Sequence, residues 1–112
     1  MSIEQPNVVD IISTSKSGGI VLTISDHLDW SDTQRHLLML QEKINTYLRF
    51  LESEEVYQRY PDALGHRITI KVVFQIEPNL EAHSFLSKAQ AIVEGAGFGF
   101  EFDLFSATPY LI

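Results

Sequence analysis

A strict alternation of apolar and polar residues predicts one strand of the chain at residues 67–77. Successive side chains of a strand point to opposite faces of a sheet, so a repeat of two places all the apolar members on one face. One face of this strand is therefore expected to be buried and the other to be polar. The positions expected on the buried face are Ile68, Ile70, Val72, Phe74 and Ile76.

Three further segments carry strand patterns. Residues 7–14 and 20–25 are rich in β-branched side chains, and the turn cluster between them contains Gly18-Gly19. A short glycine turn between two such runs predicts a β-hairpin. Residues 98–104 alternate aromatic or apolar with small or acidic residues, which predicts a final strand with one aromatic face.

Apolar residues at spacings of three and four predict two amphipathic helices. The first is expected to run for about 20 residues to near Glu52, with Ser31 and Gln34 as a capping box and Asp29 as a second cap candidate. The second is expected to begin at Asn79 and to end at Gly95 or Gly97. Its apolar stripe is expected to comprise Leu80, Phe85, Leu86, Ala89, Ile92 and Val93.

The element order is thus β-β-α-β-α-β, an α+β chain expected to form one domain over residues 1–112 with a flexible arm at 1–6. Because both helices are amphipathic, they are expected to cover the same side of a roughly four-stranded mixed sheet in a two-layer sandwich. The strand order stays open. Pro61, Asp62 and Gly65 mark a loop in residues 53–66, which also has room for an extra helical turn.

Composition narrows the function classes. The net charge of −7 argues against binding to a nucleic-acid backbone, which needs clustered basic residues, and favours a basic partner. The chain has no cysteine, which tilts towards a cytoplasmic location and excludes thiol chemistry. No apolar run is long enough for a membrane span, and no motif calls for a cofactor.

Three stretches carry a resemblance to a known family: VVDIISTSKSGGIVLTISDHLDW, HLLMLQEKINTYLRFLES and VVFQIEPNLEAHSFLSKAQAIVEGAGFGFEF. Together they cover most of the chain. They resemble a family of small bacterial proteins without a characterised function. The resemblance implies a bacterial, cytoplasmic, single-domain protein, and it supplies no catalytic or binding residues.

A cluster of histidine and carboxylate residues runs from Asp26 to His36. His27, Asp29 and Asp32 lie between them. Such side chains can bind a divalent metal or transfer protons, which makes His27 and His36 weak metal-ligand candidates. Their spacing matches no metal signature, and helix capping accounts for the carboxylates equally well.

Acidic residues also form candidate surfaces for a protein partner. One group stands at the end of the first helix, one on the final strand, and one in the segment after the second strand. A basic neighbour such as Lys71 would turn the pair on the final strand into an ordinary cross-strand contact. The candidate partner-binding residues are Glu52, Glu54, Glu55, Glu101, Asp103, Asp26 and Asp29.

These patterns favour a non-enzymatic protein-binding module. Its most concrete form is an immunity protein that neutralises a basic bacterial toxin by occluding the toxin's active site. One alternative is a homo-oligomeric module, such as a homodimer, that associates through the polar sheet face or the apolar tail at residues 105–112. The other is a small metal-dependent enzyme that uses the segment from Asp26 to His36.

Overall fold

A computed structural model describes residues 11–14, 19–61 and 65–104. The expected arm at 1–6, the start of the first strand at 7–10 and the tail at 105–112 lie outside these ranges. The four strands and three helices, in chain order, are β1 (Ile11–Thr14), β2 (Ile20–Asp26), α1 (Thr33–Glu52), α2 (Glu55–Arg59), β3 (Ile68–Phe74), α3 (Leu80–Gly95) and β4 (Gly99–Leu104).

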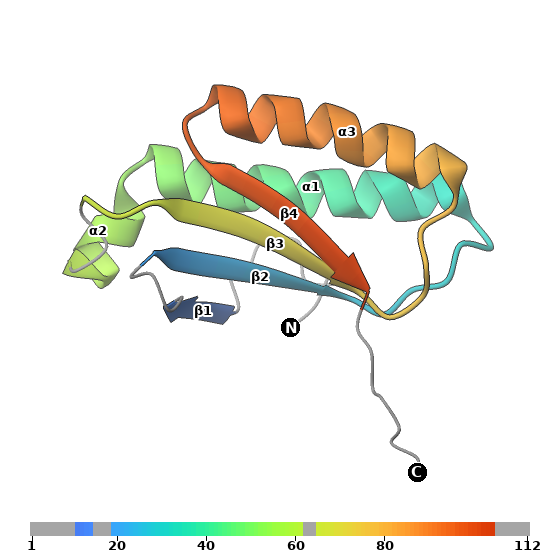
Figure 1. The fold of residues 1–112 in the computed structure, drawn as a ribbon, viewed down its shortest axis with the longest axis horizontal. Helices are drawn as coiled ribbons and strands as arrows, with labels where there is room; N and C mark the ends of the chain where they lie inside the picture. Colours follow the sequence, from blue (N-terminus) through green and yellow to red (C-terminus); the bar gives the residue numbers. More distant parts are fainter. Residues whose placement is uncertain (1–10, 15–18, 62–64, 105–112) are drawn as a thin grey trace, which may run out of the picture.

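The strands form one mixed sheet in the order β1-β2-β3-β4. The β1–β2 pair is antiparallel, whereas β2–β3 and β3–β4 are parallel. Parallel connections are right-handed almost without exception, and both connections here step across the sheet in the same direction. Both long helices therefore cover one face of the sheet, as Figure 1 shows. The predicted α+β fold and element order are confirmed, and the strand order is now defined.

The core lies between this sheet face and the two long helices. Along both β2 and β3, buried and half-buried residues alternate, which matches the expected repeat of two. Ile76 was expected on the buried face, but β3 ends at Phe74 and Ile76 is 43% exposed. The most deeply buried apolar residues of the strands, with at most 1% of their surface exposed, are Leu22, Ile24, Ile70, Val72 and Phe74.

The N-cap of the first long helix lies one residue later than predicted. Asp32 is the N-cap, and its carboxylate accepts a hydrogen bond from the backbone N–H of Arg35. The proposed capping box is wrong: the Ser31 hydroxyl donates to Asp29, and the Gln34 amide donates to Glu81 of α3. The predicted length and the end at Glu52 are confirmed.

The second long helix starts as predicted, but part of its predicted apolar stripe is exposed to solvent. Asn79 is the N-cap and accepts from the backbone N–H of Ala82, while Gly97 adopts a left-handed φ of 99° just past the helix end. Leu80 and Ile92 were expected in the core, yet they are 88% and 65% exposed. The turn after α1 contains α2, the extra helical turn that residues 53–66 had room for.

Gly99 allows a close approach between β3 and β4. It pairs with Thr69, and an added Cβ would lie 2.7 Å from Thr69 Oγ1 and 2.9 Å from Arg67 Nη2. Because threonine is stiff at χ1, Gly99→Ala is expected to lower the free energy of unfolding by about 1–3 kcal/mol in urea denaturation. Gly95→Ala is the matched control, since no atom lies within 4 Å of its added Cβ. It should raise stability by up to about 1 kcal/mol. Equal losses in the two variants would contradict the close approach.

Among the described residues, no helix has the length and apolar character that a membrane-spanning segment needs.

Candidate functional site

A buried pair of polar side chains stands where β2 ends and α1 begins. Asp26 is the last residue of β2 and is fully buried, and His36, in the first turn of α1, is only 2% exposed. His36 Nε2 lies 2.6 Å from Asp26 Oδ2, and His36 Nδ1 lies 2.9 Å from the backbone oxygen of Asp29. The segment between the two elements thus folds back so that residues ten apart form a buried pair, which we call the Asp26–His36 dyad.

The hydrogen-bond partners fix how many protons the dyad holds. A carbonyl oxygen can only accept, so Nδ1 of His36 carries a hydrogen and donates it to Asp29. The contact between Nε2 and the Asp26 carboxyl then needs one further proton, on either atom. In both arrangements the Asp26–His36 dyad is electrically neutral as a whole, which makes its burial tolerable.

Burial also acts on the acidity of Asp26. Removal from water raises the pKa of the Asp26 carboxyl above its ordinary value, while the hydrogen bond and the charge of His36 and the backbone N–H of Leu28 act in the opposite direction. The net effect is a raised pKa. The proton shared within the dyad is therefore held more strongly than an exposed aspartate would hold it.

The sole tryptophan holds the dyad in place. The Trp30 ring stacks on the His36 ring, with centroids 3.7 Å apart and planes at 17°. The ring centroids of Trp30 and Phe74 are 5.9 Å apart. Its indole N–H donates to the backbone oxygen of Ile76, beyond the end of β3. The backbone oxygen of Asp26 accepts from Gln75 N–H in the same region. The dyad and Trp30 therefore join the ends of β2 and β3 to the start of α1.

This arrangement leaves His36 without a free ring nitrogen. A general base needs an available lone pair, and a metal ligand needs a nitrogen directed at the ion, whereas both nitrogens of His36 are bonded within the protein. Among the described residues, no group of three or more histidine, aspartate or glutamate side chains is placed to hold a metal ion. The other weak metal candidate, His27, is exposed and belongs to no such group.

A pH experiment tests the dyad through the Asp26→Asn variant. The raised pKa means that, above the ordinary value of 3.8, folded Asp26 keeps a proton that the unfolded chain has lost. Its contribution to stability is therefore complete below about pH 4 and falls as the pH rises through the folded pKa. Urea denaturation should show Asp26→Asn gaining stability relative to the wild type as the pH rises above about 4. If Asp26→Asn instead lost stability relative to the wild type as the pH rose, folding would lower the Asp26 pKa.

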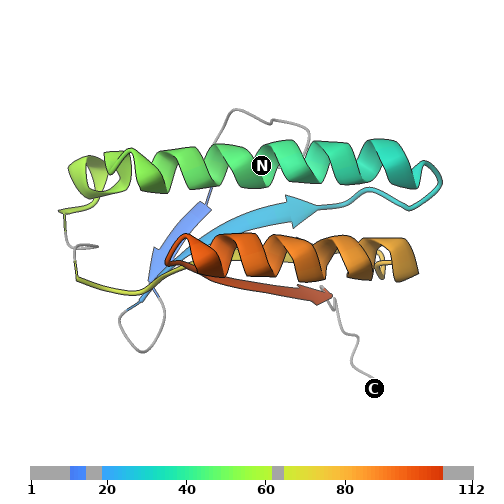
Figure 2. The same cartoon turned by 90° about the horizontal axis from the view of Figure 1, so that it is seen from above.

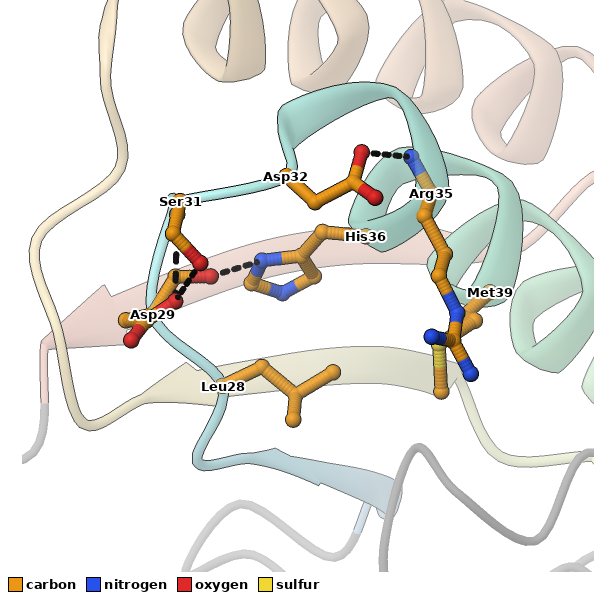
Figure 3. A pocket seen from close by; sticks show the side chains of 7 residues that line it. All are labelled: Leu28, Asp29, Ser31, Asp32, Arg35, His36 and Met39. Atoms are coloured by element: carbon orange, nitrogen blue, oxygen red, sulfur yellow. Dashed lines mark hydrogen bonds between the residues drawn. The ribbon is translucent and has the colours of Figure 1, made fainter.

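A small pocket of about 200 Å³ opens beside His36. Figure 3 shows its lining, in which the ring of His36 lies between Asp29 and Ser31 on one side and Arg35 and Met39 on the other. Its two carboxylates already have structural roles, because Asp32 caps α1 and Asp29 accepts from both the hydroxyl and the N–H of Ser31. These two hydrogen bonds lower the pKa of Asp29. The acidic residues of this pocket thus shape a turn and a helix cap.

The acidic candidates of the sequence separate into four environments. Asp26 is removed from the partner-binding set, because its fully buried carboxyl bonds to His36 and cannot reach another protein. Asp29 is exposed but engaged in its turn. On the polar sheet face, Lys71 Nζ lies 3.3 Å from Asp103 and 3.9 Å from Glu101, the cross-strand contact that the sequence allowed for.

The acidic residues at the end of α1 are placed differently. Glu52, Glu54 and Glu55 are all exposed at the junction of α1 and α2, and no ion pair joins any of them to a cation among the described residues. We call this set the acidic end. Fully buried Val56 anchors the short helix α2 behind it. Glu54 has a φ of 65°, the left-handed conformation that a residue with a Cβ seldom adopts.

An aromatic pocket adjoins the acidic end. It has a volume of about 370 Å³ and lies between the turn after α2 and the edge strand β1, with Tyr60 in its lining. The Arg59 guanidinium lies 5.6 Å from the ring centre of Phe50 and 5.8 Å from that of Tyr60. No local sequence pattern points to this pocket, because its walls are three segments separated in the chain: Ile12–Thr14, Ile20 and Arg59–Pro61.

Comparisons with known proteins gave one match. The model of a protein family described as a family of unknown function (DUF6572) covers residues 1–106. No curated protein and no solved structure matches the chain. The family match agrees with the resemblance found in the sequence, and it adds no assigned activity.

Proposed function

Because the chain belongs to the DUF6572 family, whose description assigns no activity, we propose a function from its own geometry. The protein is a non-enzymatic binding module that recognises a basic protein partner through the acidic end. The observation that carries the proposal is the group of three exposed, unpaired glutamates where α1 meets α2.

The positions of two of these glutamates lower the stability of the fold. Glu52 is the last residue of α1, where the negative end of the helix dipole disfavours an anion. Glu54 is held in the left-handed region, which costs on the order of 1 kcal/mol for a residue other than glycine. Strained and electrostatically disfavoured residues concentrate at functional sites, so this placement supports a binding role for the acidic end.

The neighbouring pocket supplies the apolar part of an interface. Tyrosine and arginine are the residue types that most often dominate binding energy between proteins, and Tyr60 and Arg59 line this pocket. Tyr60 is 39% exposed, and Arg59 is exposed as well. A partner could therefore insert a side chain beside Tyr60 while its cations face the acidic end.

The most concrete partner is a toxin domain with a basic active site, such as one that binds nucleic acid. The acidic end would attract such a domain over a distance, and the pocket would hold it while the bound protein occludes the active site. A bacterial, cytoplasmic protein without cysteine is suited to this immunity role. A metal-dependent enzyme is not proposed, because both ring nitrogens of His36 are already bonded within the protein.

Capture of the partner tests this function. The protein would be tagged at its N-terminus, used as bait in an extract of its source cells, and the bound proteins identified by mass spectrometry. The expected result is one dominant basic protein that elutes at high salt, because salt screens the attraction between exposed charges. An unrelated bait protein of equal net charge serves as the control. If this protein enriches no basic protein relative to that control, the result counts against the proposal.

A further inference from the structure

A groove with apolar walls runs between α1 and α3. Figure 2 shows the two helices side by side above the sheet. Their first turns are joined by hydrogen bonds from Gln34 to Glu81 and from Asn79 to Thr33. Further along, the helices leave a groove of about 360 Å³ whose apolar lining is Ile44, Leu48, Phe85, Ala89, Ile92 and Val93.

Three apolar side chains on the groove rim and around the start of α3 are exposed. Ile92 on the rim is 65% exposed, Leu80 at the first turn is 88% exposed, and nearby Ile76 is 43% exposed. The sequence pattern had placed all three in the core. Exposed apolar side chains such as these are available to a protein contact.

Charges of opposite sign accompany this apolar surface. Lys88 is the one charged residue in the groove lining, and no ion pair joins it to another described residue. Glu81 lies seven residues earlier, so at about 100° per residue the two side chains project along nearly the same line of α3, about 10 Å apart. Ile92 continues that line.

We propose that this surface binds a second copy of the chain, with α3 packed antiparallel against α3 of its partner. A two-fold axis between Ser84 and Phe85 sets Glu81 of each copy opposite Lys88 of the other, and a two-fold contact makes this pair twice. The same register carries Ile92 to the partner's helix start, where Ile76 and Leu80 are exposed. The chain thus supplies both members of each Glu81–Lys88 pair and exposed apolar residues on both sides of the contact.

The residues of the acidic end take no part in this contact. Glu52 and α2 lie at the far end of α1 from the first turns that hold Leu80 and Glu81 (Figure 2). Each dimer therefore presents two copies of the acidic end. The dimer does not depend on the proposed function, because its geometry involves neither the glutamates of that end nor the pocket beside Tyr60.

Analytical ultracentrifugation of the full chain over a range of concentrations tests the dimer. The wild type should dimerise, and Ile92→Glu should sediment as a monomer because it buries a charge in the contact. Lys88→Glu and Glu81→Lys should each raise the dimer dissociation constant at least about tenfold, and the double variant should return it to within about threefold of the wild type. Gln90→Glu, a charge change elsewhere on α3, should leave it unchanged.

Two results would overturn the proposal. One is a wild-type protein that sediments as a monomer at every concentration. The other is a double variant that fails to recover the dimer although it is folded by circular dichroism. Glu81 also accepts a hydrogen bond from Gln34, which Glu81→Lys would remove. The dissociation constant of Lys88→Glu does not depend on that bond.

Discussion

The His36→Ala variant is expected to lower the free energy of unfolding by about 3–5 kcal/mol, because it leaves a buried carboxyl without its partner. Asp26 is fully buried, and His36 is its side-chain hydrogen-bond partner. The variant also removes the ring on which Trp30 stacks and the donor to the backbone oxygen of Asp29. Urea denaturation, monitored by the fluorescence of the single tryptophan, which stacks on His36, measures this loss of stability.

Two further variants separate the dyad from a general effect of losing a histidine. His66→Ala, at an exposed position, should stay within about 0.5 kcal/mol of the wild type. Asp26→Asn should cost much less than His36→Ala, because an amide can donate to His36 Nε2 and still accept from the N–H of Leu28. If His36→Ala behaves like His66→Ala, the buried hydrogen bonds do not stabilise the fold as described.

Replacing all three glutamates of the acidic end by glutamine is expected to slow association with the captured partner by about 10- to 100-fold at low salt. Exposed charges at the rim of an interface act mainly on the rate of encounter, so the dissociation rate should change less. The difference should shrink as salt is added, because ions screen the attraction. Surface plasmon resonance at several salt concentrations measures both rates.

The matched control removes negative charge from other helical positions. Glu42 on α1 and Glu94 on α3 are exposed and lie outside the acidic end. Their joint replacement by glutamine, compared with Glu54→Gln and Glu55→Gln together, removes the same charge from a different place. Equal slowing in both pairs would show that net charge alone, and not the acidic end, attracts the partner.

Local sequence patterns predicted what depends on neighbouring residues. The repeat of two in residues 67–77 gave the buried face of β3, and the cap at Asn79 gave the start of α3, because both signals act within a few residues. The cap of α1 was assigned to Ser31 instead of Asp32, since both residue types cap well. Only the turn formed by Asp29 and Ser31 decides between them.

Contacts between distant segments could not be predicted in this way. The Asp26–His36 dyad depends on the path of the loop between β2 and α1, and Trp30 reaches Ile76, 46 residues away. Leu80 and Ile92 fit the apolar stripe of α3, yet both are exposed, and Ile92 lines the groove that α1 and α3 leave between them. The aromatic pocket beside the acidic end is likewise assembled from separate segments.

The sheet topology explains why the dyad region is closed. In open sheets with parallel strands, ligands bind beyond the carboxyl ends of the strands where the order of the strands reverses. Here the order β1-β2-β3-β4 never reverses, and both long helices lie on one face. The carboxyl ends of β2 and β3 are instead filled by Asp26, His36 and Trp30, which moves the proposed binding surface to the opposite end of α1.

Isothermal titration calorimetry of the captured partner tests most directly whether function lies at the acidic end or at the dyad. The wild type would be compared with the triple glutamine variant of the acidic end and with Asp26→Asn. The account predicts that the triple variant loses at least about tenfold in affinity, whereas Asp26→Asn binds as the wild type does. Unchanged affinity in the triple variant, together with a loss in Asp26→Asn, would contradict it and place the binding surface beside His36.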